Sequence, residues 1–123
     1  MADTADPRRA LGEYGERLAE RYLTDLGLTV VDRNWRCARG ELDLVVRDGD
    51  CLVFCEVKTR RTERFGSAVE AVHPRKAARL RRLASAWLQE HQVHPARIRI
   101  DVIGILRPAE GRAVVRHLQG VEA

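Results

Sequence analysis

The sequence predicts an α/β fold in which helices flank a central mixed β-sheet. Two segments carry apolar residues at helical spacing, and five shorter runs have the composition and alternation typical of strands. Their order is helix, three strands, helix, two strands, which is typical of one sheet covered by helices. A length of 123 residues suits a single domain over residues 1–123, in which residues 1–6 are expected to be a disordered tail.

The first helix is expected to begin at Pro7, because Asp6 is a suitable N-cap and proline is favoured at the first helical position. Gly27 suits the position just past the helix end. The expected apolar stripe consists of Leu11, Tyr14, Leu18, Tyr22 and Leu26. At about 100° per residue, Glu16 falls at the border of this stripe, so its carboxylate is expected to reach the sheet.

Three strand-like runs follow the first helix. The segment LTVVDRNW, residues 28–35, is interpreted as a strand, and the polar segment RCARG, residues 36–40, as a loop. The runs ELDLVVR (41–47) and CLVFCEVK (51–58) are interpreted as two more strands. The Asp-Gly pair between them is a strong signal for a β-hairpin.

The register of this hairpin decides which carboxylates meet, because side chains alternate between the two faces of a strand. If residues 48–49 form the loop, Glu41 lies opposite Glu56. If residues 49–50 form it, Asp43 lies there instead. A three-residue loop would place Asp43 and Glu56 on opposite faces of the sheet.

The second half of the chain predicts one helix and two strands. The polar segment TRRTERFGS (59–67) is expected to be a loop, and a helix is expected from Pro74 to near His91. The buried stripe of this helix should consist of Ala77, Leu80, Leu83, Ala84, Trp87 and Leu88. The final strands are RIRIDVIGIL (97–106) and AVVRHL (113–118), in which Asp101 is expected to pair with an arginine.

Composition favours a cytoplasmic protein with an anionic partner. No apolar stretch is long enough to cross a bilayer, and the N-terminus lacks the features of an export signal, so we expect no membrane association. Lys and Arg number 22 against 18 Asp and Glu, and arginine suits bidentate phosphate contacts. The expected nucleic-acid contacts are Arg17, Arg60, Arg61, Arg75, Lys76 and Arg79.

Glu56 and Lys58 lie in a run that is otherwise typical of a buried central strand, where an unpaired charge is costly. A divalent cation, Mg²⁺ or Mn²⁺, bound between Asp43 and Glu56 would compensate that cost, and Lys58 would then hold the attacking water or the phosphate. The residues alone leave a second interpretation open, in which Asp43, Glu56 and Lys58 form a structural cross-strand ion pair.

The string GELDLVVRDGDCLVFCEVKTR resembles the PD-(D/E)xK nuclease signature, in which an acidic residue precedes a hairpin and an acid-x-Lys triplet closes it. The resemblance implies Asp43, Glu56 and Lys58 as catalytic residues. It also implies a metal site formed by Asp43, Glu56 and the backbone carbonyl of Val57. The proline of the signature is absent, because Leu42 precedes Asp43.

Over nearly the whole chain, the segments GEYGERLAERYL, GELDLV, EVKTR, FGS with AV, and RIDVI resemble the YraN family of small bacterial proteins. This resemblance implies a restriction-endonuclease-like fold. The spacing G-x-x-x-E in residues 12–16 is similar to the opening helix of archaeal Holliday-junction resolvases, whose glutamate lies at the metal site. It therefore implies Glu16 as a further catalytic and metal-binding residue, with Arg17 beside it.

We therefore expect a metal-dependent endonuclease acting on DNA. Because no helix-turn-helix or zinc-finger spacing is present, branched or otherwise non-standard structures are the expected substrate. The main alternative is a non-catalytic nucleic-acid-binding module that retains the nuclease fold. A third interpretation, an interaction scaffold with a structural ion-pair cluster, leaves the triplet from Glu56 to Lys58 unexplained. The sequence leaves homodimer formation open.

Overall fold

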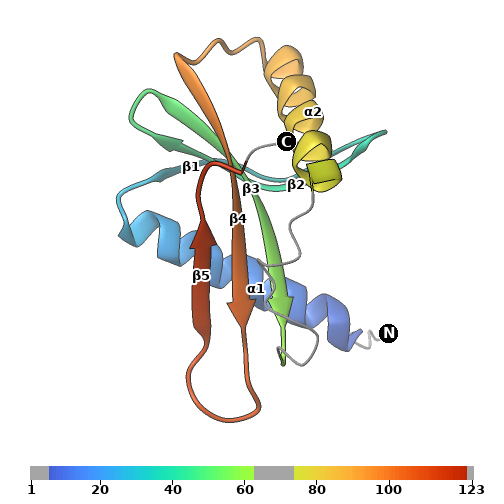
Figure 1. Cartoon of the computed structure of the whole chain (residues 1–123), viewed down its shortest axis with the longest axis vertical. Coiled ribbons are helices and arrows are strands. Elements are labelled where there is room, and N and C mark those ends of the chain that lie inside the picture. The colour runs from blue at the N-terminus through green and yellow to red at the C-terminus, as the bar shows by residue number, and fades with distance from the viewer. Residues whose placement is uncertain (1–5, 63–73, 122–123) are drawn as a thin grey trace, which may run out of the picture.

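The computed structural model describes residues 6–62 and 74–121, and in this part the chain forms a mixed α/β structure (Figure 1). The elements are α1 (Pro7–Asp25), β1 (Thr29–Cys37), β2 (Gly40–Asp48), β3 (Cys51–Arg60), α2 (Pro74–His91), β4 (Arg97–Leu106) and β5 (Val114–Leu118). The strands pair in the order β1-β2-β3-β4-β5, and all neighbours are antiparallel except β3 and β4. The prediction of a mixed sheet with flanking helices is confirmed.

The two helices cover opposite faces of this sheet (Figure 1). Along the central strand β3, Phe54 packs with α2, whereas Val53 and Cys55 pack with α1. Because both faces of β3 are covered, its residues from Cys51 to Val57 are all buried. A charged residue in this strand is therefore removed from water, which makes Glu56 costly unless it has a partner.

The buried face of α1 differs from the predicted stripe. Its fully buried residues are Gly15, Ala19 and Leu23, whereas Leu26 is 54% exposed. Three members of the predicted stripe, Tyr14, Leu18 and Tyr22, pack at the edge of the contact as partly buried residues. The prediction of the stripe is therefore wrong at its centre, because small residues let the helix approach the sheet more closely than bulky ones would.

Gly15 is the point of closest approach between α1 and the sheet. A Cβ atom at this position would lie 1.7 Å from the Thr59 side-chain oxygen on β3, a distance that no side chain tolerates. The helix can therefore lie this close to β3 only because residue 15 is glycine. Glu16 follows directly, so the same contact brings its carboxylate toward the sheet.

The second helix follows the prediction, with Pro74 and His91 as its first and last residues. Its buried side chains are Ala77, Leu80, Leu83, Ala84 and Trp87, with Leu88 partly buried beside them. Among the described residues, no helix combines the length and the apolar character that crossing a bilayer requires.

Two predicted loops are shorter than expected. The loop predicted over residues 36–40 is partly wrong, because Cys37 already pairs with Gly40 and only two residues connect β1 to β2. Gly40 has a φ of +143°, a backbone conformation that favours glycine and permits this tight connection. The loop predicted over residues 59–67 is also partly wrong, because β3 continues to Arg60. Residues 63–67 lie outside the described part of the chain.

A buried polar network fixes the C-terminal side of the sheet. Asp101 is fully buried and accepts two hydrogen bonds from the Arg99 guanidinium, at 2.9 and 3.0 Å, which confirms the predicted pairing with an arginine. His117 Nε2 lies 2.7 Å from Asp101, and the other ring nitrogen lies 3.0 Å from the Tyr22 hydroxyl on α1. The backbone N–H of Gly120 also donates to Asp101, at 3.1 Å.

Candidate metal centre

The β2–β3 hairpin adopts the second of the two registers considered above. Its pairs run from Asp48 with Cys51 to Leu44 with Cys55, so residues 49–50 form the loop. One further step in this register would bring Asp43 opposite Glu56, but the regular pairing ends at Leu44 and Cys55. The register is thus the one that the expected meeting of these two carboxylates requires, and the meeting itself stays a prediction.

Asp43 lies just beyond the last pair of the ladder. In a regular strand, Leu42 and Val45 would point to opposite faces of the sheet. Both pack in the core under α2, so the alternation of β2 is broken between them. The Asp43 carboxylate accepts a 2.7 Å hydrogen bond from the backbone N–H of Val57, the residue between Glu56 and Lys58. This bond ties the Asp43 side chain to the end of β3.

Glu56 is 7% exposed and has three cationic side chains around its carboxylate. The ammonium nitrogen of Lys76 lies 2.5 Å from Oε2, and that of Lys58 lies 3.9 Å from the same oxygen. Arg79 donates a 3.3 Å hydrogen bond to Oε1. The contact of Lys76 with Oε2 is an ion pair without hydrogen-bond geometry, so this buried oxygen accepts no hydrogen bond. Both oxygens of Glu56 thus have a cationic partner, and only the partner of Oε1 donates a hydrogen bond.

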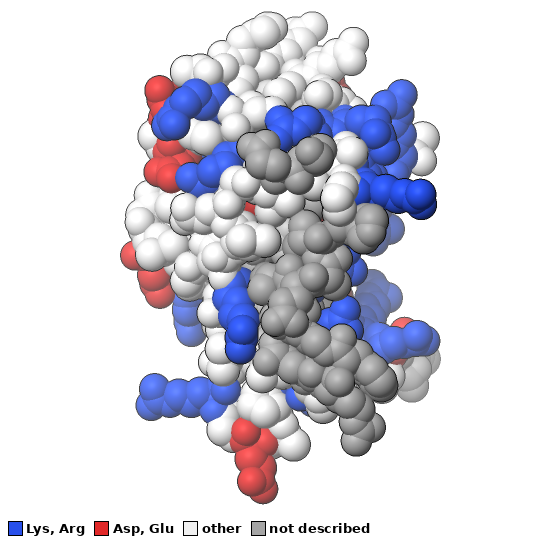
Figure 2. Space-filling view, in the orientation of Figure 1, with Lys and Arg blue, Asp and Glu red and all other residues white. Residues whose placement is uncertain are grey.

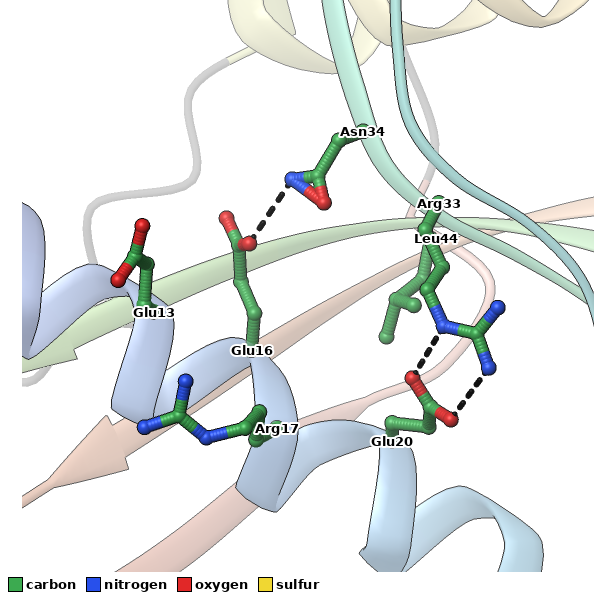
Figure 3. A pocket seen from close by; sticks show the side chains of 7 residues that line it. All are labelled: Glu13, Glu16, Arg17, Glu20, Arg33, Asn34 and Leu44. Atoms are coloured by element: carbon green, nitrogen blue, oxygen red, sulfur yellow. Dashed lines mark hydrogen bonds and ion pairs between the residues drawn. The ribbon is translucent and has the colours of Figure 1, made fainter.

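Glu16 lines a pocket of about 220 Å³ between α1 and β1 (Figure 3). Asn34 on β1 donates a 2.9 Å hydrogen bond to its carboxylate, from a backbone with a φ of +49°. One turn further along α1, Glu20 accepts two 2.7 Å hydrogen bonds from Arg33. These contacts hold α1 against β1 and keep Glu16 on the side of the helix that faces the sheet.

The carboxylates of this region influence one another. Burial raises the pKa of Asp43 to about 7, against the opposing hydrogen bond from Val57, and the negative charges of Glu16, Glu56 and Glu41 raise it further. The pKa of Glu16 is also raised, first by burial and then by Glu41. An additional positive charge placed among these groups would favour their ionised forms.

Lys58 is part of the same electrostatic group. Burial lowers the pKa of its ammonium group, and the nearby Lys76 lowers it further, whereas Glu56 and Asp43 act in the opposite direction. Lys58 therefore lies beside the two predicted metal ligands and beside a second lysine from α2.

Three residues at this site were not predicted as part of it. Glu41 accepts a 3.3 Å hydrogen bond from Arg36 and raises the pKa of Asp43. The sequence offered a signal for Glu41, because one of the two hairpin registers places it opposite Glu56. Asn34 and Gly15 act through contacts between elements distant in sequence, for which the sequence carries no local signal.

The predicted nucleic-acid contacts occupy different environments. Lys76 and Arg79 face Glu56, so much of their charge is directed into the site. Arg17, Arg61 and Arg75 are exposed, and Arg60 is half-buried. Figure 2 shows basic side chains on the side of the molecule where Figure 1 draws the start of α2. This side therefore offers positive charge next to the buried carboxylates.

The donor set fits a hard divalent cation. Among residues 6–62 and 74–121, no three acidic, histidine or cysteine side chains are gathered closely enough to cage a metal by themselves. Mg²⁺ commonly needs only one or two carboxylates, with waters and substrate phosphates completing its shell. The Glu56 oxygen without a hydrogen bond and the Asp43 carboxylate, which has other carboxylates nearby, would be the oxygen ligands of such an ion.

The fold and the site define a small mixed α/β protein with a carboxylate–lysine cluster at the end of its central strand. The chain belongs to the uncharacterised protein family UPF0102, whose profile matches residues 15–105. It is 58% identical over 113 residues to a UPF0102 protein of Kineococcus radiotolerans, covering 91% of this chain and 93% of the relative. It is also 59% identical over 111 residues to a UPF0102 protein of Frankia alni, covering 90% and 92%. The family resemblance drawn from the sequence is confirmed to this extent.

Proposed function

We propose that this protein is a metal-dependent endonuclease with a restriction-endonuclease-like fold that acts on DNA. The observation that carries the proposal is the hydrogen bond from Val57 to Asp43, which joins the acidic residue before the hairpin to the triplet from Glu56 to Lys58. This is the grouping that the PD-(D/E)xK signature requires, supplied here by two neighbouring strands.

Each residue of the group has a chemical role in this proposal. Asp43, Glu56, the backbone carbonyl of Val57 and Glu16 would hold Mg²⁺ or Mn²⁺. When bound, such an ion supplies Lewis-acid chemistry, polarising the phosphodiester and stabilising charge on the leaving oxygen. Lys58 would orient the attacking water and a phosphate oxygen, a role that its position beside Glu56 supports.

The proposed substrate is DNA recognised by shape. In the described residues, α1 and α2 are separated by three strands, so they do not form a helix-turn-helix for reading base edges. The predicted contacts Arg17, Arg60, Arg61, Arg75, Lys76 and Arg79 would bind phosphates. Because branched DNA bends at a lower energetic cost than intact duplex, we propose a preference for junctions and flaps.

A second candidate function is a nucleic-acid-binding module without catalysis. One observation favours it: both oxygens of Glu56 already have cationic partners from the protein itself, Lys76 at one and Arg79 at the other. A cluster neutralised in this way can be purely structural. The two candidates differ in whether DNA is cut when a divalent ion is supplied.

A cleavage assay in Mn²⁺ or Mg²⁺ on four-way, flap and linear DNA of equal length tests both candidates. We expect cleavage near the branch by the wild type, and loss of cleavage by Lys58→Ala with most of the DNA affinity retained. Arg82→Met, an exposed site on α2, is the control and should cut normally. Full cleavage by Lys58→Ala would remove Lys58 from the mechanism, and binding without cleavage in every metal would favour the binding module. Equal affinity for the three substrates would contradict recognition by shape.

A further inference from the structure

We propose that Lys76 and Arg79 form a cation clamp on Glu56 that competes with the divalent ion, so that metal loading releases both side chains toward DNA phosphates. This inference rests on the proposed function and adds regulation to the same site. It gives α2, which contributes none of the proposed metal ligands, a direct part in coupling metal binding to DNA binding.

The clamp is built from contacts between two elements distant in sequence. Glu56 is on the buried strand β3, and its carboxylate is reached by Lys76 and Arg79 from the start of α2. The Lys76 side chain is only 23% exposed, whereas that of Arg79 is 41% exposed. Lys76 is therefore inserted into the site, where an ion pair is screened less by water than at the surface.

The clamp and a metal ion require the same atoms. Arg79 holds Oε1 of Glu56, and Lys76 lies 2.5 Å from Oε2. Mg²⁺ binds a carboxylate oxygen at about 2.0 Å. A divalent cation on Oε2 would repel the Lys76 ammonium more strongly than that of Lys58, because Lys76 lies at 2.5 Å from this oxygen and Lys58 at 3.9 Å. Metal binding at Glu56 therefore displaces Lys76 and weakens the hold of Arg79.

The released side chains have a new partner available. Both are long and flexible, and both belong to the first part of α2, near which Figure 2 shows further basic side chains. Phosphates bound there would contact the Lys76 and Arg79 side chains, which are paired with Glu56 when no metal is bound. Because coupling between two ligands is reciprocal, DNA should then tighten metal binding by the same factor by which metal tightens DNA binding.

The first test measures Mn²⁺ affinity of the full chain without DNA by calorimetry. We expect Lys76→Met to bind Mn²⁺ roughly tenfold more tightly than the wild type, a factor within the usual range of coupling between sites. Arg82→Met removes the same charge from an exposed position on the same helix and should leave the affinity within about twofold. Lys76→Gln, which keeps a polar side chain, serves as a second variant if Lys76→Met does not fold.

The second test measures DNA binding in EDTA and in Mn²⁺ on a Lys58→Ala background, which should keep the DNA intact. In this parent, Mn²⁺ should steepen the slope of log affinity against log salt concentration by an amount that corresponds to about two phosphate contacts. It should leave the salt dependence of Lys76→Met/Arg79→Met unchanged. An equal effect of Mn²⁺ in the parent and the double variant would overturn the clamp.

The outcomes separate the clamp from the proposed function. Mn²⁺ binding to the wild type with no gain in Lys76→Met or Lys76→Gln would overturn the clamp and leave the metal-dependent nuclease standing. Absence of Mn²⁺ binding in the wild type and in both variants would overturn the metal centre, and the clamp with it.

Discussion

The backbone N–H of Val57 donates a 2.7 Å hydrogen bond to the carboxylate of Asp43. Two adjacent strands are thereby joined by a side chain at the point where their regular pairing has ended. The bond orients Asp43 toward the residues that flank Val57, and the same carboxylate has a pKa raised to about 7, with burial as the main cause. The geometry and the charge of the proposed centre therefore both depend on Asp43.

The raised pKa of Asp43 predicts a pH-dependent stability. Its pKa is about 7 in the folded protein against about 3.8 unfolded, so the favourable contribution is fully present below pH 4 and is lost as the pH rises to about 7. In EDTA, Asp43→Asn should therefore gain stability over the wild type by about 1.4 kcal/mol per pH unit between pH 5 and 7. Urea unfolding at several pH values measures this, and a difference independent of pH would contradict it.

Metal binding should depend on the same proton. Because a metal ion needs the ionised carboxylate, Mn²⁺ affinity should rise about tenfold per pH unit up to about pH 7 and then level off. Calorimetry measures this affinity.

The same measurement on the wild type and on Glu56→Ala tests whether Glu56 is a ligand, with circular dichroism to establish that both are folded. Equal Mn²⁺ affinity in the two proteins would remove Glu56 from the site.

The close approach of α1 predicts opposite effects for two glycines on one helix. Gly15→Ala should destabilise the protein by about 2 kcal/mol, because the new methyl group collides with Thr59. Gly12→Ala has open space around its Cβ and should stabilise by about 1 kcal/mol through helix propensity. Urea unfolding measures both, and a stable Gly15→Ala would show that the contact is not tight.

The buried network around Asp101 predicts a stability effect remote from the proposed centre. Burial opposes ionisation of Asp101, but hydrogen bonds from His117, Arg99 and Gly120 hold its pKa below the ordinary value. Its stabilising contribution is therefore present above about pH 4 and is lost as the pH falls further.

Asp101→Asn should accordingly cost about 3 kcal/mol at pH 7, because it breaks a buried ion pair. The control is Asp50→Asn, which breaks the exposed ion pair with Arg97 and should change little. Thermal unfolding at pH 7 and at pH 3 tests this, and an equal loss at both pH values would contradict the assignment of the charge.

Much of the fold was readable from local patterns. The Asp-Gly pair indicated the hairpin but left its register open, and the apolar spacing of α2 matched its buried face. The face of α1 was misplaced because bulky residues dominate such patterns, whereas here Gly15 and Ala19 make the closest contact. A close approach by small residues depends on the partner strand, which the helix sequence does not encode.

The proposed site was readable only in part, for a similar reason. Asp43, Glu56 and Lys58 stand in one recognisable string on the two strands of a hairpin, so their neighbouring positions could be predicted, whereas the bond from Val57 to Asp43 could not. The pairing of Lys76 with Glu56 joins α2 to β3 and follows from tertiary packing alone. The sequence indicated a basic residue for DNA contact there, without indicating that its charge would be directed at a buried carboxylate.

The presence of a metal ion between Asp43 and Glu56 is the central claim. Diffraction from crystals soaked in Mn²⁺, collected at an energy where manganese scatters anomalously, tests it most directly. We predict an anomalous peak within coordination distance of both carboxylates, with Lys76 withdrawn from Glu56. Well-ordered Asp43 and Glu56 carboxylates without such a peak, in crystals soaked in saturating Mn²⁺, would contradict the account.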